Sequence, residues 1–158
     1  MRQDGEPAPA PPPPAGTRAR DLAAGAVAVI FDLDGVLVDT EPWWHEVRVA
    51  YARSHGRAWT AEDSRACMGR NSAEWAVVMR ERLGIAEAPE AIERAIVDAL
   101  VARYRTTAVP IVAGAPETAA RIAARVPAAI ASSAHREVIG AALAATGLAP
   151  LFGVVVSS

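Results

Sequence analysis

The chain has 158 residues, a formal net charge of −2 and a single cysteine, Cys67. That length suits one domain or one core with an insert. The charge provides no basic field for nucleic acid or an anionic membrane, and one cysteine excludes an internal disulfide. We find no secretory signal and no apolar run near the ~20 residues that cross a bilayer. The sequence therefore favours a soluble, cytoplasmic protein with no nucleic-acid or membrane partner.

The first 20 residues form a proline-rich, low-complexity tail. Consecutive prolines hold φ near the polyproline II value and supply no backbone donors, so this segment cannot join a core. One interpretation is a docking peptide for an aromatic-lined groove. The sparse flanking charge favours the other, a disordered extension, which is our prediction for residues 1–20.

An uninterrupted apolar run, AVAVIFDL, begins at Ala26. Such a run predicts a strand buried on both faces, as in parallel sheets that are covered by helices. It leads directly into two aspartates separated by one residue, Asp32 and Asp34. Because a buried strand does not normally end on unpaired carboxylates, we expect a metal ion or another cation there.

Four helical patterns follow with no strand between them, and we expect them to form an inserted α-helical cap over residues 41–106. Thr60, with Asp63 three residues later, has a capping-box-like start. Ser72 is placed to cap the next helix, and Pro89 opens the last one. The tryptophans are assigned to the core of the cap: Trp43, Trp44, Trp59 and Trp75.

Strand patterns return in VPAAIASS and FGVVVSS, each preceded by a helical pattern. The order strand, helix, strand, helix, strand predicts an α/β fold with a parallel sheet, formed by residues 21–40 and 107–158. Ligands of such sheets bind beyond the carboxyl ends of the strands. We therefore expect Asp32, Asp34 and Ser132 to lie at one edge of the sheet.

The residues at this edge suit phosphoryl chemistry. Asp32 can attack phosphorus and form an acyl phosphate, and Asp34 can protonate the leaving oxygen and later activate water. Mg²⁺ would relieve repulsion between the carboxylates and a phosphate. Gly35 permits close backbone approach to a phosphoryl group. Ser132 offers a hydroxyl ahead of a helix N-terminus, which is a natural phosphate site.

Simpler interpretations exist for these residues. Asp-x-Asp-Gly also opens calcium loops, but a loop starting at Asp32 needs a glutamate at its twelfth position, which is Trp43. A plain strand-to-turn transition remains an alternative. Ser132 and Ser133 have an alternative role as caps of the next helix. His135 follows them and either approaches the phosphate or simply begins that helix.

The segment FDLDGVLVDTEP resembles the first motif of the haloacid dehalogenase (HAD) superfamily, and IASS resembles the second. The resemblance covers residues 26–158 and implies a HAD-like Rossmannoid parallel sheet, incomplete with about three strands, and an inserted helical cap. It also implies Asp32 as nucleophile, Asp34 as acid/base and Ser132 as a phosphoryl ligand. Mg²⁺ would be held by Asp32 and the backbone carbonyl of Asp34. We expect hydrolysis of a small phosphorylated metabolite or sugar phosphate through a phosphoaspartate.

Within this superfamily, β-phosphoglucomutase-like enzymes are the alternative to phosphatases. These mutases place a histidine early in the first cap helix and an arginine before a later one. Here Trp44 precedes His45, and Arg70 is shifted from the expected position, so we favour a phosphatase over a mutase. Arg70 and Asn71 are candidates to reach the substrate from the cap, although an exposed arginine is more often only solvated.

The family pattern also includes a basic residue, usually lysine, and a later acidic pair that completes the magnesium site. The sequence contains no lysine, and we assign neither feature. We therefore expect a C-terminally truncated phosphatase that has little turnover by itself. The alternatives are a non-catalytic remnant or binding module, and a partner chain that supplies the missing strands.

Overall fold

A computed structural model describes residues 25–157, so the tail predicted for residues 1–20 lies outside the described part. Three strands form one parallel sheet in the order β1-β2-β3: β1 (Val29–Phe31), β2 (Ala128–Ser132) and β3 (Val154–Ser157). In its register, Ile30 pairs with Ala129, and Ile130 pairs with Val155. The predicted α/β fold with three parallel strands is confirmed.

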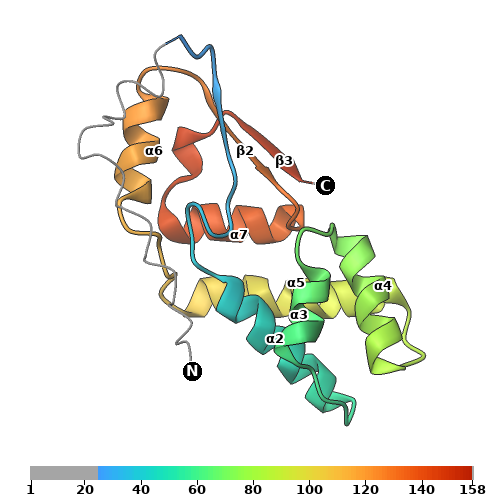
Figure 1. Cartoon of the computed structure of the whole chain (residues 1–158). Helices are drawn as coiled ribbons and strands as arrows, with labels where there is room; N and C mark the ends of the chain where they lie inside the picture. The colour runs from blue at the N-terminus through green and yellow to red at the C-terminus, as the bar shows by residue number, and fades with distance from the viewer. Residues whose placement is uncertain (1–24, 158) are drawn as a thin grey trace, which may run out of the picture.

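Four helices follow β1 without an intervening strand: α2 (Glu41–Ser54), α3 (Ala61–Cys67), α4 (Ser72–Leu83) and α5 (Pro89–Thr106). The remaining elements alternate with the strands: α6 (Ala115–Ala123) precedes β2, and α7 (Arg136–Thr146) with the short 3-10 helix η1 (Ala149–Leu151) precedes β3. Figure 1 shows α7 between the sheet and α5, with α2, α3 and α4 at the end opposite the sheet. Within residues 25–157, no helix is both long enough and apolar enough to cross a membrane.

The starts of α3 and α4 show which predicted caps are formed. Thr60 and Asp63 make the predicted capping box, with Asp63 N–H donating to Thr60 Oγ1 (3.2 Å) and Thr60 N–H donating to Asp63 Oδ2 (2.8 Å). The prediction that Ser72 caps α4 is wrong, because Asn71 is the N-cap. Asn71 has extended backbone (ψ 171°), and its Oδ1 accepts from Glu74 N–H at 3.0 Å. Ser72 is already helical and buried.

The hydrophobic core is centred on α5, which contacts α2, α4 and α7. Its predicted apolar stripe is buried: Ile92, Ile96, Leu100 and Val101. Fully burying one such side chain contributes roughly 1.5–3 kcal/mol. Trp43, Trp59 and Trp75 are also buried, as predicted, whereas Trp44 is only partly buried.

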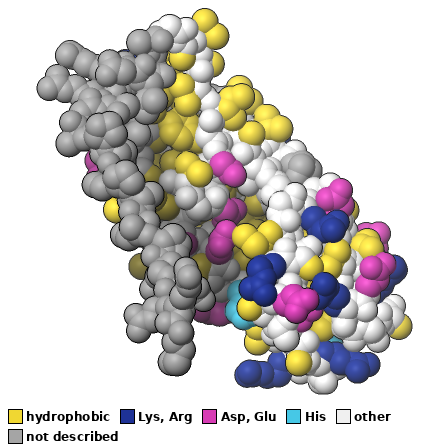
Figure 2. Space-filling view, in the orientation of Figure 1, with side chains coloured by type: hydrophobic (Ala, Val, Ile, Leu, Met, Phe, Trp, Pro, Cys, Tyr) yellow, Lys and Arg dark blue, Asp and Glu magenta, His cyan; other side chains and the backbone are white. Residues whose placement is uncertain are grey.

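One face of the sheet is open. The prediction that the first strand is buried on both faces is wrong, because Ile30 is 70% exposed. Val154 and Val156 of β3 are also more than half exposed. Figure 2 shows hydrophobic side chains over the sheet end, whereas charged side chains gather over α3 and α4. The helices among the described residues therefore cover the strands incompletely.

Candidate active site

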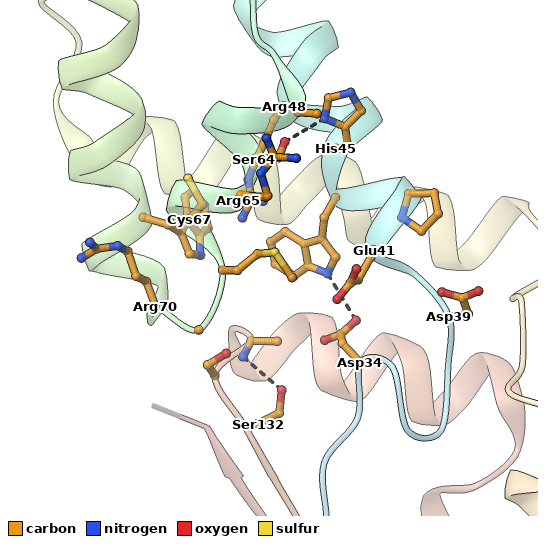
Figure 3. A pocket seen from close by; sticks show the side chains of 18 of the residues that line it. Asp34, Asp39, Glu41, His45, Arg48, Ser64, Arg65, Cys67, Arg70 and Ser132 are labelled. Carbon is orange, nitrogen blue, oxygen red and sulfur yellow. Dashed lines mark hydrogen bonds between the residues drawn. The ribbon is translucent and has the colours of Figure 1, made fainter. Parts of the chain in front are cut away.

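A pocket of about 510 Å³ lies between the carboxyl ends of β1 and β2 and the helices α2, α3 and α4. Asp32, Asp34 and Ser132 all line it, so the structure brings together the three residues that the topology predicted at this edge. Figure 3 shows Asp34 and Ser132 on one side of the pocket, with Arg48, His45 and other residues from the helices on the other. We call these two sides the sheet wall and the helix wall.

A tight turn after β1 positions the two aspartates. Leu33, between them, is fully buried, and its carbonyl oxygen accepts hydrogen bonds from the N–H groups of residues 36–38. Gly35 has φ +76°, a left-handed conformation that favours glycine, and its N–H donates to the Val38 carbonyl (2.7 Å). Gly35 is not among the residues that line the pocket. Its observed contribution is therefore to the shape of the turn.

Asp34 lies in a partly buried hydrogen-bond network. Its Oδ1 accepts from Thr40 Oγ1 (2.5 Å) and from Trp44 Nε1 (3.3 Å). The Tyr104 hydroxyl in turn donates to Thr40 Oγ1 (3.2 Å). Burial raises the pKa of Asp34 above its ordinary value, and the nearby Asp32 charge adds to the increase, although the two hydrogen bonds oppose it. A raised pKa favours a carboxyl group that carries a proton.

Asp32 lies in a different environment. Its side chain is exposed to the pocket, and its Oδ1 accepts a hydrogen bond from the adjacent Leu33 N–H (2.6 Å). A solvated carboxylate is available for attack on a ligand, whereas the Asp34 carboxyl is enclosed. The two aspartates are thus chemically distinct although only one residue separates them.

The second predicted motif also lines the pocket, through Ser132, Ser133 and Ala134. Ser132 Oγ accepts from Ala134 N–H at 3.1 Å. The residue that caps α7 is His135, whose Nδ1 accepts from Glu137 N–H (3.3 Å). The interpretation of Ser132 as the helix cap is therefore wrong, and His135 begins the helix instead of lining the pocket.

Of the two candidate substrate contacts outside the sheet, Arg70 and Asn71, only Arg70 lines the pocket. Arg70 lines the pocket and is exposed, with its Nε donating to the Ala66 carbonyl (2.9 Å). Asn71 is not among the lining residues, because its side chain caps α4. The approach of Asn71 to a substrate therefore has no support in the geometry.

Sequence reasoning missed several residues of the helix wall. Arg48 lines the pocket and is buried. A hydrogen bond joins His45 Nδ1 and Ser64 Oγ (2.7 Å), and Trp59 Nε1 donates to the same oxygen (2.9 Å). Spacing offers a signal only for Trp44 and Arg48, which are four residues apart and so share one face of α2. The contact of His45 with Ser64 crosses from α2 to α3 and has no local sequence signal, whereas Trp59 reaches Ser64 from the segment just before α3.

The carboxylates of the pocket suit Mg²⁺ in part. In the described part of the chain, no three His, Cys, Asp or Glu side chains gather into a metal-binding group. Mg²⁺ commonly takes one or two carboxylates and completes its shell with waters and substrate oxygens. The carboxylate of Asp32 together with the backbone carbonyl of Asp34 fits that pattern.

The structure thus combines a parallel α/β sheet, an aspartate pair beyond its first strand and an inserted set of helices that faces this pair. A family model for haloacid dehalogenase-like hydrolases matches residues 27–158, and the chain belongs to this family. The resemblance inferred from the sequence motifs is thereby confirmed.

Individual relatives are phosphatases and phosphoglucomutase-like proteins. The chain is 38% identical over 69 residues to a phosphorylated carbohydrates phosphatase of Thermotoga maritima, covering 44% of this chain and 32% of that protein. A structure from T. maritima, assigned as a β-phosphoglucomutase, is 28% identical with a TM-score of 0.60, covering 82% of this chain and 60% of that one. CbbY from Rhodobacter sphaeroides, in complex with phosphate, shares the fold with 20% identity and a TM-score of 0.72, covering 84% and 63%. The chain thus spans less than two thirds of each relative.

Proposed function

We propose that this site hydrolyses a phosphomonoester of a small phosphorylated metabolite or sugar phosphate, with Asp32 as the nucleophile and Asp34 as the general acid and base. The observation that carries the proposal is the difference between the two carboxyl groups in one pocket. Asp32 is exposed, whereas burial raises the pKa of Asp34. Neighbouring acids in different environments are suited to different roles.

The proposed reaction has two displacements. A carboxylate oxygen of Asp32 attacks phosphorus as the bond from phosphorus to the leaving oxygen breaks, and Asp34 gives its proton to that oxygen. Water then attacks the phosphoaspartate, Asp34 takes a proton from the water, and the bond to Asp32 breaks to release inorganic phosphate. Asp34 thereby returns to its protonated state for the next cycle.

The other groups at the sheet wall would hold the phosphoryl group. Ser132 lies in the same pocket and offers its hydroxyl to a phosphoryl oxygen. Asp32 and the backbone carbonyl of Asp34 would hold Mg²⁺, which when bound supplies positive charge to the phosphoryl oxygens. The turn at Gly35 fixes the direction in which both aspartates leave β1.

The helices over residues 41–106 would act as the cap that selects the substrate. They supply the wall opposite the aspartates, through α2, α3 and α4. A pocket of about 510 Å³ suits a small metabolite, and pockets of this kind span ≈ 300–1,000 Å³. The phosphatase activity given for the T. maritima relative supports a phosphorylated carbohydrate as the substrate class.

Two other functions compete with this proposal. A sugar-phosphate mutase is favoured by the likeness to the T. maritima structure assigned as a β-phosphoglucomutase. A non-catalytic binding module is favoured by the absence of lysine from the sequence, because a missing cationic contact to the transition state commonly costs on the order of a hundredfold in rate. For the same reason we expect turnover by this chain to be low.

The test is magnesium-dependent phosphate release from a panel of sugar phosphates, by the native chain and by Asp32→Asn. We expect release that requires Mg²⁺ and is lost in Asp32→Asn, with a trapped phosphoaspartate detected by mass spectrometry in the native chain. Glu41→Gln is a matched control, because it also removes one negative charge from the pocket lining. Equal release by the native chain and Asp32→Asn would overturn the proposed nucleophile. Conversion of one sugar phosphate into another would favour the mutase, and phosphate binding without release would favour the binding module.

A further inference from the structure

The helix wall contains a buried arginine without an anionic partner. Arg48 is 6% exposed, and it lines the same pocket as the two aspartates. Within residues 25–157, its Nε has no hydrogen-bond partner, and no carboxylate forms an ion pair with its guanidinium. A buried charge is costly unless it is paired and hydrogen-bonded. The position therefore needs an explanation beyond packing.

Two tryptophan rings hold the Arg48 side chain in place. Its Cζ lies 5.0 Å from the ring centroid of Trp44 and 5.4 Å from that of Trp75. Such cation–π contacts are worth about 0.5–2 kcal/mol each and do not use the N–H donors of the guanidinium. The stacking thus orients the group while leaving its hydrogen-bonding capacity unused.

The two groups whose charges act most strongly on Arg48 form no ion pair with it. Burial lowers the pKa of Arg48, and the largest opposing charges are those of Cys67 and Asp34. Burial, however, raises the pKa of the Cys67 thiol, so that it is uncharged at neutral pH. The Asp34 carboxyl is already engaged with Thr40 and Trp44.

Arg103, a second stacked arginine within residues 41–106, provides a comparison for Arg48. Arg103 also stacks on a tryptophan, with its Cζ 4.7 Å from the Trp43 centroid. Unlike Arg48, it forms an ion pair with Glu46 (2.6 Å), and it does not line the pocket. Stacking on tryptophan therefore does not by itself leave an arginine unpaired. The unpaired arginine is the one that faces the ligand space.

The position of Arg48 relative to the aspartates defines its role. Trp44 contacts both sides, because its Nε1 donates to Asp34 Oδ1 (3.3 Å) while its ring stacks against Arg48. In Figure 3, Arg48 lies with His45 on the helix wall, and Asp34 lies on the sheet wall. A ligand that places one phosphate at the aspartates thus has a cation available for a second anionic group.

We propose that Arg48 binds a second anionic group of the substrate, so that the site prefers phosphomonoesters that carry a further phosphate or carboxylate. This inference rests on the proposed function for the placement of the first phosphate, and it narrows the substrate class. The planar guanidinium is suited to bidentate contact with either anion. The ligand would supply the partner that the described residues do not.

The experiment measures binding, so that it does not depend on turnover. Calorimetric titrations in the Asp32→Asn background, with Mg²⁺, compare fructose 1,6-bisphosphate with fructose 6-phosphate, and 3-phosphoglycerate with glycerol 3-phosphate. The first pair tests a second phosphate and the second pair tests a carboxylate. We expect one or both probes with a second anionic group to bind about 10- to 100-fold more tightly than their partners, the range for hydrogen bonds to charged groups.

Variants of Arg48 then test the source of that preference. We expect Arg48→Met, which keeps an apolar stem between the two rings, to abolish the preference, and Arg48→Lys to retain part of it. Arg103→Met is the matched control, because it removes a stacked arginine outside the pocket and should keep the full preference. Arg48→Gln replaces Arg48→Met if thermal melting shows that the latter does not fold.

The outcomes separate this inference from the proposed function. No preference for the probes with a second anionic group in the Asp32→Asn protein, or an unchanged preference after loss of Arg48, would overturn the role of Arg48. Loss of the preference in Arg103→Met as well would also overturn it. Absence of magnesium-dependent phosphate release from the native chain would overturn only the proposed hydrolysis.

Discussion

The two walls of the pocket rest on differently packed parts of the molecule. The sheet wall follows strands whose outer face is open, with Ile30 70% exposed. The helix wall rests on α5, where Ile96 and Leu100 are fully buried. The residues proposed to perform the chemistry therefore extend from the sparsely covered side, and the residues that shape the ligand space extend from the densely packed side.

The largest expected effect is a difference in stability between two isoleucine-to-alanine substitutions, one in the core around α5 and one on the open face of the sheet. Ile96→Ala should lower the free energy of unfolding by about 2–5 kcal/mol, because it leaves a cavity in the core around α5. Ile30→Ala removes the same atoms from an exposed position and should change stability by less than about 1 kcal/mol. Urea denaturation followed by circular dichroism measures both. Equal losses would contradict the contrast in packing between the two walls.

The next effect concerns the hydrogen bonds that join the two walls. Thr40 is fully buried and links Asp34 of the sheet wall to Tyr104 of α5. Thr40→Val leaves the Tyr104 hydroxyl without its acceptor and removes one of the two donors to Asp34, so we expect a loss of about 1–3 kcal/mol in unfolding free energy. Tyr104→Phe removes only the outer hydrogen bond and should cost less.

A double-mutant cycle over Thr40→Val and Tyr104→Phe separates this connection from packing. Residues within one network show interaction energies of about 0.5–3 kcal/mol. We expect the double variant to be more stable than the sum of the single losses predicts. If the losses of the two single variants simply add in the double variant, Thr40 and Tyr104 are not energetically coupled, and the proposed connection between the walls is contradicted.

Parts of the fold and site could be predicted because their signals are local. The pair Asp32 and Asp34 directly follows an apolar run, and the order of strand and helix patterns requires a parallel sheet. These features bring the aspartates near Ser132 across nearly a hundred residues of sequence. The capping box from Thr60 to Asp63 spans only four residues and could also be predicted from the sequence.

Other parts could not be predicted because they depend on what packs in three dimensions. The apolar run around Ile30 has the composition of a covered strand, yet its exposure depends on which elements pack on each face. Arg48 resembles any solvated helical arginine, and its burial follows from Trp75, which approaches from another helix. Asn71 and Ser72 are both good capping residues, so only the backbone geometry decides which of them begins α4.

A smaller effect tests the start of α4 in the helix wall. Asn71→Ala removes the cap oxygen that accepts from Glu74 N–H, so we expect a loss of about 1 kcal/mol in unfolding free energy. Ser72→Ala should be neutral or slightly stabilising, because Ser72 Oγ is buried and has no hydrogen-bond partner among residues 25–157. Thermal melting of the two variants side by side measures the difference. A larger loss of stability in Ser72→Ala than in Asn71→Ala would indicate that Ser72 is the N-cap of α4.

The smallest effect concerns the pH dependence of the helix wall at α3. Hydrogen bonds from Thr60 hold the pKa of Asp63 below its ordinary value, and the ion pair with Arg82 adds to this. A carboxylate with a lowered pKa in the folded state contributes stability at pH values above about 4, its value in the unfolded chain, and this contribution is lost as the pH falls through the folded value. Between pH 7 and pH 3, Asp63→Asn should therefore lose less melting temperature than the native chain. Glu62→Gln is the matched control, because it removes a charge from the same turn but does not take part in the capping box. An equal decrease in melting temperature for the native chain and Asp63→Asn would show that the capping box contributes no pH-dependent stability, and that the packing against α4 holds α3 by itself.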